Sequence, residues 1–277
     1  MFADDTNLVF SSTNLNLLYK IINDELSLIS NWFKVNNISF NIKKTDYILF
    51  CSGSKKIDNK GLDILIDKTK INQVTKTKFL SGIITDNLNL NEHIKIISCK
   101  LSKNIGILFK IHHNIDREML LMLYHTLILT YLEYCNIVWS NGCAINLQQL
   151  FQKQKKGCQS YYILSAPIFN RLKLLKLSEI NVLQNCCFVS NLFMVYFLQQ
   201  FKDMFVLNNE MYSCNTRNKN NIHITSNHIN VRARSIKVYG TRIWNSLNQH
   251  LKDCLSFEFF KRHCKNYTLS TRLNVLT

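Results

Sequence analysis

Two adjacent aspartates, Asp4 and Asp5, are the residues of this chain best suited to metal-dependent chemistry. They follow Phe2-Ala3 and precede an apolar run, Thr6–Phe10, which predicts a short strand with the carboxylates at a β-turn. Mg²⁺ prefers carboxylate oxygens, and one or two of them with substrate phosphates are enough to hold it. Two such ions would lower the charge on the attacking and leaving oxygens of phosphoryl transfer. The alternative is that the pair is an ordinary solvated turn.

The segments around this pair predict an α+β region over residues 1–90. Apolar residues recur at steps of three and four from Asn14 to Val35, which is typical of a long amphipathic helix packed on a sheet. Three short β-branched or aromatic runs follow, and each predicts a strand: Tyr47–Cys51, Leu62–Ile66 and Lys78–Ile84.

Helical patterns replace strand patterns beyond Asn91, so we predict a domain boundary near residue 90. Asp116 or Asn114 is suited to cap a helix from Arg117 to about Trp139. Further helices are expected at about 170–175, 180–200 and 257–265, with an exposed polar loop over 208–230. The two most apolar stretches, Met119–Leu132 and Cys186–Leu198, are shorter than the roughly 20 residues of a membrane span. We therefore expect no membrane segment.

The chain is strongly basic, with 34 Lys and Arg against 18 Asp and Glu and a net charge of +16. Such an excess suits a polyanion, above all nucleic acid, although an AT-rich coding sequence also enriches lysine without selection for charge. No CxxC spacing occurs among the ten cysteines, and Cys254, His263 and Cys264 lack a fourth ligand for zinc. Reduced thiols and the lack of a signal peptide at Met1 predict an intracellular protein, cytoplasmic or nuclear.

Two groups of basic residues are candidates for contact with phosphates. In the helix that begins near residue 91, Lys100, Lys103 and Lys110 fall within about 80° of one another by helical periodicity. Near the carboxyl end, a second cluster lies beside the aromatic residues Tyr239 and Trp244, and it comprises Arg232, Arg234, Lys237 and Arg242. Charge and base stacking together suit RNA. The alternatives are a solvated lysine face for the first group and a core role for the aromatic pair.

The segment FADDTNLVF resembles the FADD/YADD box of reverse transcriptases, and the chain behind it is similar in order to jockey-type non-LTR retrotransposon polymerases. NDELSLISNWFKVNNISFNIKKTDYILF resembles the palm helix and strand, with an Asn-x-x-Lys-Thr box at Asn41, Lys44 and Thr45. KFLSGIITDNLNLNEHI resembles the primer-grip hairpin, although Ser81, Thr85 and Leu90 stand where the family has Gly, Asp and often Trp. LSKNIGILFKI and LMLYHTLILTYLEYCNIVW are similar to the thumb.

The resemblance implies a partial polymerase palm at 1–90, a helical thumb at 91–165 and a helical, basic tail at 166–277. It implies Mg²⁺ held by Asp4 and Asp5, Lys44 near the incoming nucleotide, and RNA template and RNA–DNA duplex as partners. The family's third palm aspartate and its fingers precede the FADD box. We therefore expect this chain to be a carboxy-terminal part of an RNA-directed DNA polymerase, inactive alone. The alternatives are a non-catalytic module that binds RNA or DNA, and a decayed relic of a transposon.

Overall fold

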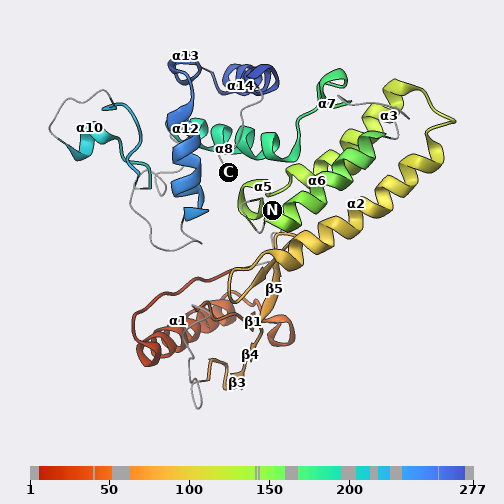
Figure 1. Ribbon diagram of the computed structural model, residues 1–277. Helices are drawn as coiled ribbons and strands as arrows, with labels where there is room; N and C mark the ends of the chain where they lie inside the picture. The colour runs from red at the N-terminus through yellow and green to blue at the C-terminus, as the bar shows by residue number, and fades with distance from the viewer. Residues whose placement is uncertain are drawn as a thin grey trace. The chain divides into compact units, whose positions relative to one another are not determined.

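The computed structural model describes residues 6–39, 41–51, 63–140, 142, 144–159, 168–194, 204–212, 218–224, 233–254 and 256–271 (Figure 1). The chain divides into two compact units, Met1–Leu90 and Asn91–Thr277. The first unit combines one long helix with short strands, and the second unit is mostly helical, so the fold class is α+β with helix predominant.

The first unit is organised around α1 (Leu15–Val35), which confirms the predicted amphipathic helix. Its first turn is capped by the Asn14 side chain, which accepts hydrogen bonds from the backbone N–H groups of Asn16 and Leu17. Tyr19 and Leu26 are buried on the inner face of the helix, and they form a small core with isoleucines of the strand region: Ile64, Ile66 and Ile71.

Three two-stranded sheets follow α1. β1 (Asp46–Tyr47) pairs in parallel with β4 (Asn72–Gln73), and β2 (Leu65–Ile66) pairs antiparallel with β3 (Thr69–Lys70). β5 (Lys76–Phe79) and β6 (Gly82–Thr85) form an antiparallel hairpin. The helix is tied to this region by Asn23, whose side chain donates to the Asp63 carbonyl at 3.0 Å and accepts from the Leu65 N–H at 2.9 Å.

Several strand predictions were wrong. Residues 6–10 form no strand, because no described segment pairs with them. The predicted strand at Tyr47–Cys51 ends after Tyr47, and the one at Leu62–Ile66 is limited to β2 within the described part. The single strand predicted at Lys78–Ile84 is a hairpin, because Leu80 and Ser81 both take positive φ values, 44° and 66°. Two consecutive residues of this kind make the tight turn that fits the strand twist.

The second unit is helical (Figure 1). Its helices are α2 (Asn91–Ile111), α3 (Arg117–Tyr124), α4 (Thr130–Glu133), α5 (Asn136–Trp139), α6 (Ala144–Gln159), α7 (Ile168–Arg171), α8 (Leu177–Met194), α10 (Asn208–Met211), α12 (Thr241–Ser246), α13 (Gln249–Lys252) and α14 (Phe257–Thr271). Two π-helical turns join them, η2 (His125–Leu129) before α4 and η3 (Ile236–Gly240) before α12. Within the described ranges, no helix combines the length and apolar character needed to cross a bilayer.

The helix predicted from Arg117 to Trp139 begins as expected, because the Asp116 side chain caps α3 by accepting from the Met119 N–H at 2.7 Å. It does not run unbroken to Trp139. The chain leaves the helix after α4, where Cys135 takes a left-handed conformation with φ of 50°, and resumes as α5. The turn places Trp139 in the core, with its indole N–H donating to the Tyr134 carbonyl at 2.8 Å.

Two groups of helices bury the core of the second unit. α2, η2, α4 and α6 enclose large aliphatic side chains that are fully buried: Leu101, Leu108, Ile128, Leu132 and Leu150. α8, α12 and α14 enclose a second cluster that includes Val189, Trp244 and Phe260. Cys254 and Cys264 also belong to this second cluster, so these thiols pack in the core.

Three further predictions for this unit need correction or restriction. The helix expected at 170–175 lies at Ile168–Arg171 instead, because Lys173 takes a left-handed φ of 50° that ends it. The segment 208–230 is not a plain exposed loop: it contains α10, and the Asn245 side chain holds buried Ile222 through both backbone groups, at 3.0 and 2.9 Å. The helix expected at 180–200 is α8, described to Met194.

Candidate nucleic-acid interface

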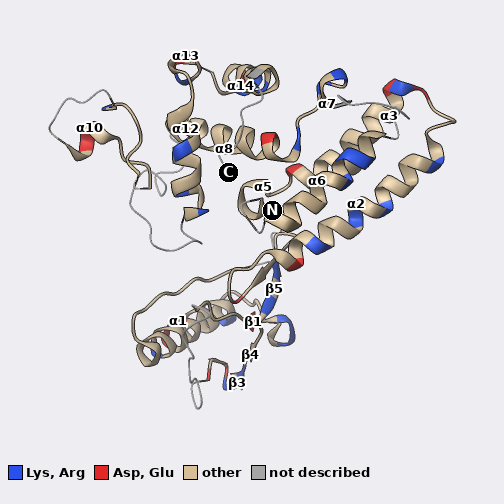
Figure 2. Ribbon diagram, in the orientation of Figure 1, with Lys and Arg blue, Asp and Glu red and all other residues tan. Residues whose placement is uncertain are grey.

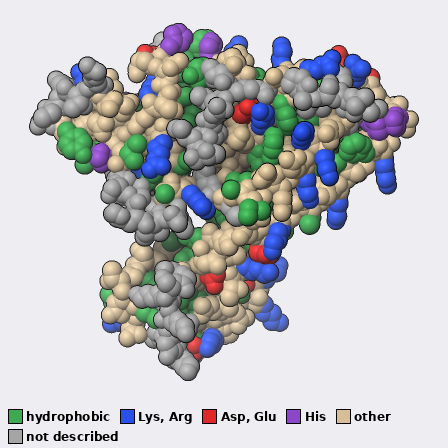
Figure 3. All heavy atoms as spheres, viewed as in Figure 1, with side chains coloured by type: hydrophobic (Ala, Val, Ile, Leu, Met, Phe, Trp, Pro, Cys, Tyr) green, Lys and Arg blue, Asp and Glu red, His purple; other side chains and the backbone are tan. Residues whose placement is uncertain are grey.

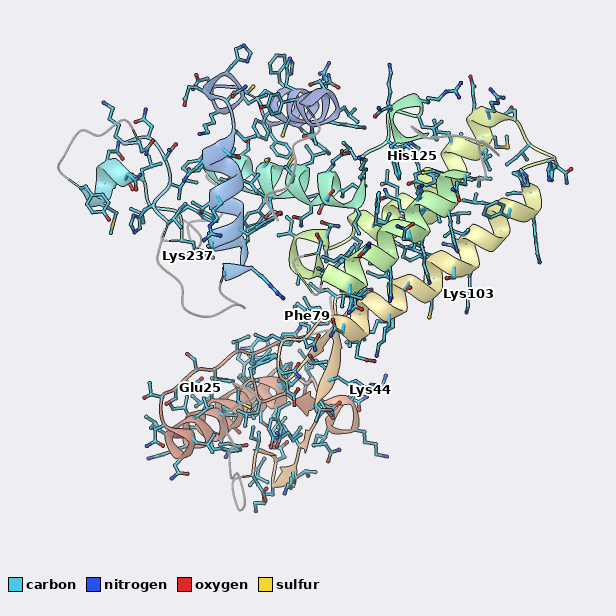
Figure 4. The ribbon with its side chains drawn as sticks, viewed as in Figure 1. Glu25, Lys44, Phe79, Lys103, His125 and Lys237 are labelled. Carbon is cyan, nitrogen blue, oxygen red and sulfur yellow. The ribbon has the colours of Figure 1, made fainter. Side chains whose placement is uncertain are left out.

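The outer face of α2 carries a row of lysines. Ile97, Leu101, Ile105 and Leu108 turn inward and are buried, so residues on the opposite side of this helix face solvent. Lys100, Lys103 and Lys110 are all exposed there. Figure 2 shows basic residues along the length of α2, and in Figure 4 the labelled Lys103 lies on the outside of the helix.

These lysines keep their charge available. Among the described residues, the ion pairs are Lys34–Asp67, Lys70–Asp63 and Lys95–Glu92, so none involves the three candidates on α2. The sequence from residue 93 to 115 contains no aspartate or glutamate. The face therefore presents positive charge without local compensation, and Figure 3 shows lysine side chains standing out from the surface here.

One lysine of the row is held by an aromatic ring. Lys100 Nζ lies 5.2 Å from the centroid of the Tyr131 ring, within the range of a cation–π interaction. The same charge acts on His93, a residue of the first turn of α2 whose side chain is buried. Burial first, and the Lys100 charge second, hold the pKa of His93 below its ordinary value.

A lysine of α6, not identified from the sequence, supports α2 from the side. Lys153 donates from Nζ to the Ser98 carbonyl at 2.9 Å and to the Ser102 hydroxyl at 2.6 Å. It joins α6 to the helix that carries the basic row. The only sequence signal was a lysine in an amphipathic helix, which does not reveal a partner 51 to 55 residues away.

Lys44 lies in a short 3-10 turn, η1 (Ile42–Lys44), and is exposed (Figure 4). Asn41 builds the turn, because its carbonyl accepts from the Lys44 N–H at 2.9 Å and from the Thr45 hydroxyl at 3.0 Å. Asp4 and Asp5 lie outside the described residues. In the described part of the chain, no three His, Cys, Asp or Glu side chains form a group able to hold a metal.

The carboxy-terminal basic cluster is placed in part. Arg232 lies outside the described residues, Arg234 and Arg242 are exposed, and Lys237 is half-buried on η3 (Figure 4). Trp244 is 6% exposed and packs against Phe193 at 5.6 Å and Phe260 at 5.8 Å between ring centroids. A base-stacking role for Trp244 is therefore wrong. Tyr239 is half-buried, and burial raises the pKa of its hydroxyl.

Cys254, His263 and Cys264 lie in the described part of the chain, where they are not gathered into a group able to hold a metal ion. The Cys264 thiol hydrogen-bonds Cys186 of α8, which lowers the pKa of Cys264 and raises that of Cys186. His263 is half-buried, and its Nδ1 lies 3.0 Å from the Phe259 carbonyl.

Comparison with protein-family models, with curated proteins and with solved structures finds no match for this chain.

Proposed function

We propose that this chain binds the phosphate backbone of nucleic acid through the outer face of α2. One observation carries the proposal: Lys100, Lys103 and Lys110 share an exposed helix face and make no ion pair within the described residues. Lysine is a flexible point charge that binds phosphate without reading sequence. The ligands we expect are single-stranded RNA template and RNA–DNA duplex.

The spacing of the row fits a regular polyanion. At 1.5 Å of rise per residue, Lys103 and Lys110 are separated by roughly 10 Å along the helix axis. Phosphates of one strand of a duplex recur about every 3.4 Å along its axis, so the two lysines can reach different phosphates of one strand.

We further propose that the chain derives from the carboxy-terminal part of an RNA-directed DNA polymerase of the non-LTR retrotransposon type. The FADD segment, the Asn41, Lys44 and Thr45 turn, and the β5–β6 hairpin support this origin. Ser81 occupies a left-handed position in the hairpin, where the family's glycine would be free of strain. In the parent enzyme, Asp4 and Asp5 would hold Mg²⁺ for nucleotidyl transfer.

The proposal is tested by fluorescence anisotropy with a labelled 20-nucleotide RNA and the matching RNA–DNA duplex. The variant Lys100→Ala/Lys103→Ala/Lys110→Ala removes three charges from α2. We expect at least a tenfold loss of affinity, because loss of each phosphate contact weakens binding by about 1 kcal/mol, near the value of a typical hydrogen bond.

The matched control is Lys20→Ala/Lys68→Ala/Lys219→Ala, which removes the same charge from exposed lysines elsewhere. Equal losses in both variants would mean that only net charge matters, and the assignment to α2 would then be wrong.

A further inference from the structure

The second unit has a hollow where α13 meets α14. Its volume is about 680 Å³, within the roughly 300–1,000 Å³ range of small-ligand sites. Its walls combine one phenyl ring, one imidazole, one guanidinium group and two carboxylates with a thiol and a hydroxyl group: His250, Asp253, Cys254, Ser256, Glu258, Phe259 and Arg262. Neither the basic row of α2 nor the carboxy-terminal cluster contributes to it.

The aromatic ring in this hollow is exposed although its neighbour is buried. Phe259 is 45% exposed, whereas Phe260 is fully buried against Trp244. On the next turn, His263 lies with its ring centroid 3.8 Å from that of Phe259. Because the His263 Nδ1 lies 3.0 Å from the Phe259 carbonyl, the imidazole is fixed under the ring. The two rings are inclined by 32°, and the exposed Phe259 ring, held by His263, is suited to stacking of a planar ligand.

Charged groups flank the ring. The Asp253 carboxylate is oriented by a 2.7 Å hydrogen bond from the Gln249 side chain, and each carboxylate oxygen has capacity for further donors. Glu258 and Arg262 lie on the same side of α14 as Phe259 by helical periodicity. Among the described residues, neither forms an ion pair with the other or with Asp253. The hollow therefore offers one oriented carboxylate, that of Asp253, together with the carboxylate of Glu258 and the guanidinium group of Arg262.

We propose that this hollow binds a guanine nucleotide. The base stacks on Phe259, and its adjacent N1–H and N2 amino donors bind the Asp253 carboxylate. Arg262 pairs with the phosphate. Uracil has a single such N–H between two carbonyl oxygens, which a carboxylate repels. The ligand is either a free nucleotide or an unpaired guanosine of RNA, since both present the same base and phosphate.

The site is tested on the whole chain by calorimetric titration with guanosine 5′-monophosphate and, for comparison, uridine 5′-monophosphate. We expect the guanine nucleotide to bind at least tenfold more tightly. Phe259→Ala should weaken its binding about tenfold, the effect of losing one base–aromatic stack. Asp253→Asn replaces the carboxylate, whose two oxygens accept from the base, by an amide with only one acceptor oxygen. It should erase the preference for the guanine nucleotide over the uracil nucleotide.

The matched control is Phe50→Ala, which removes an equally exposed phenylalanine, 47% exposed, from the first unit. It should leave binding unchanged. Circular dichroism of each variant checks that the fold is intact. The proposal would be overturned if neither the free guanine nucleotide nor a guanosine in RNA bound measurably to the intact chain. It would also be overturned if Phe259→Ala were folded and bound the guanine nucleotide as tightly as the intact chain.

The source of the guanine is distinguished with two labelled octaribonucleotides, one of uridines alone and one with a single central guanosine. Preferential binding of the second, lost in Phe259→Ala but retained in the α2 lysine variant, would indicate RNA. A preference confined to the free nucleotide would indicate a mononucleotide site. Either result is independent of whether α2 binds phosphates.

Discussion

Lys100 Nζ lies 5.2 Å from the centroid of the Tyr131 ring, so a charge of the basic row rests on a half-buried aromatic side chain of the second unit. Tyr131 is the second residue of α4, the short helix that follows the π-helical turn η2. The contact joins the outer edge of α2 to that segment. The attraction between the Tyr131 ring and the Lys100 ammonium group therefore helps to fix the position of this positive charge.

Replacement of Tyr131 tests this contact. Tyr131→Phe keeps an aromatic face and should leave the free energy of unfolding nearly unchanged. Tyr131→Leu removes the face and should lower it by about 0.5–1 kcal/mol beyond the loss in Tyr131→Phe. Urea unfolding of both variants measures the difference. If the difference persists when Lys100 is also replaced by Met, the effect comes from packing and the cation–π contact contributes nothing.

Gln154 is fully buried in α6 and holds the segment that enters α8, donating to the Leu175 carbonyl and accepting from the Leu177 N–H, both at 2.9 Å. Gln154→Leu leaves both backbone groups buried without these partners, and we expect a loss of about 2–4 kcal/mol of stability. Gln152→Leu, on the exposed side of the same helix, is the control and should cost under about 0.5 kcal/mol. Similar denaturation midpoints for the two variants would contradict this role.

His93 predicts a pH dependence of stability. Because burial, and secondarily Lys100, lower its pKa from the ordinary value of 6.5, the unfolded chain binds a proton more readily than the folded one. The neutral His93 side chain therefore makes its full contribution to the free energy of unfolding above pH 6.5, and this contribution is lost as the pH falls below that value. Urea midpoints measured from about pH 7.5 to 5 should decline less in His93→Leu than in the original chain. The pKa of His125 is also lowered, first by burial, so a residual slope remains in the variant. Identical slopes would show that His93 titrates normally.

The isolated chain should not extend a primer. Phosphoryl transfer depends on positioning and charge stabilisation, and the resemblance assigns the third aspartate and the fingers to sequence before the FADD box. A template–primer assay with Mg²⁺ and the four nucleotides is expected to show no product above background. Extension that disappears in Asp4→Ala/Asp5→Ala would refute this expectation.

Helical periodicity predicted the long helices well, because burial repeats with the turn of the helix. α1 and the buried face of α2 follow directly from that pattern. The interruption of the helix at Cys135 could not be predicted from the sequence. The segment before it is apolar on nearly all sides, so no alternation of apolar and polar residues marks where the helix ends. Very short strands were hard to delimit, because two-residue ladders depend on partners brought from elsewhere, as with β1 and β4.

Side-chain roles in the candidate site depended more on tertiary packing. Exposure of Lys103 follows from its position opposite the apolar residues of α2. Trp244 looked equally suited to stacking or core, and its burial is decided by Phe193 and Phe260, which come from two other helices. Lys153 and Gln154 act on backbone groups far away in sequence, and no local pattern marks such partners.

The salt dependence of RNA affinity tests phosphate binding by α2 most directly. A plot of the logarithm of the association constant against the logarithm of salt concentration has a negative slope. The magnitude of this slope decreases by about 0.7 for each single-strand phosphate contact removed. We therefore expect Lys100→Ala/Lys103→Ala/Lys110→Ala to reduce the slope by roughly 2, and the control variant with Lys20, Lys68 and Lys219 replaced to reduce it by much less. Unchanged slope and affinity in the α2 variant would contradict the account.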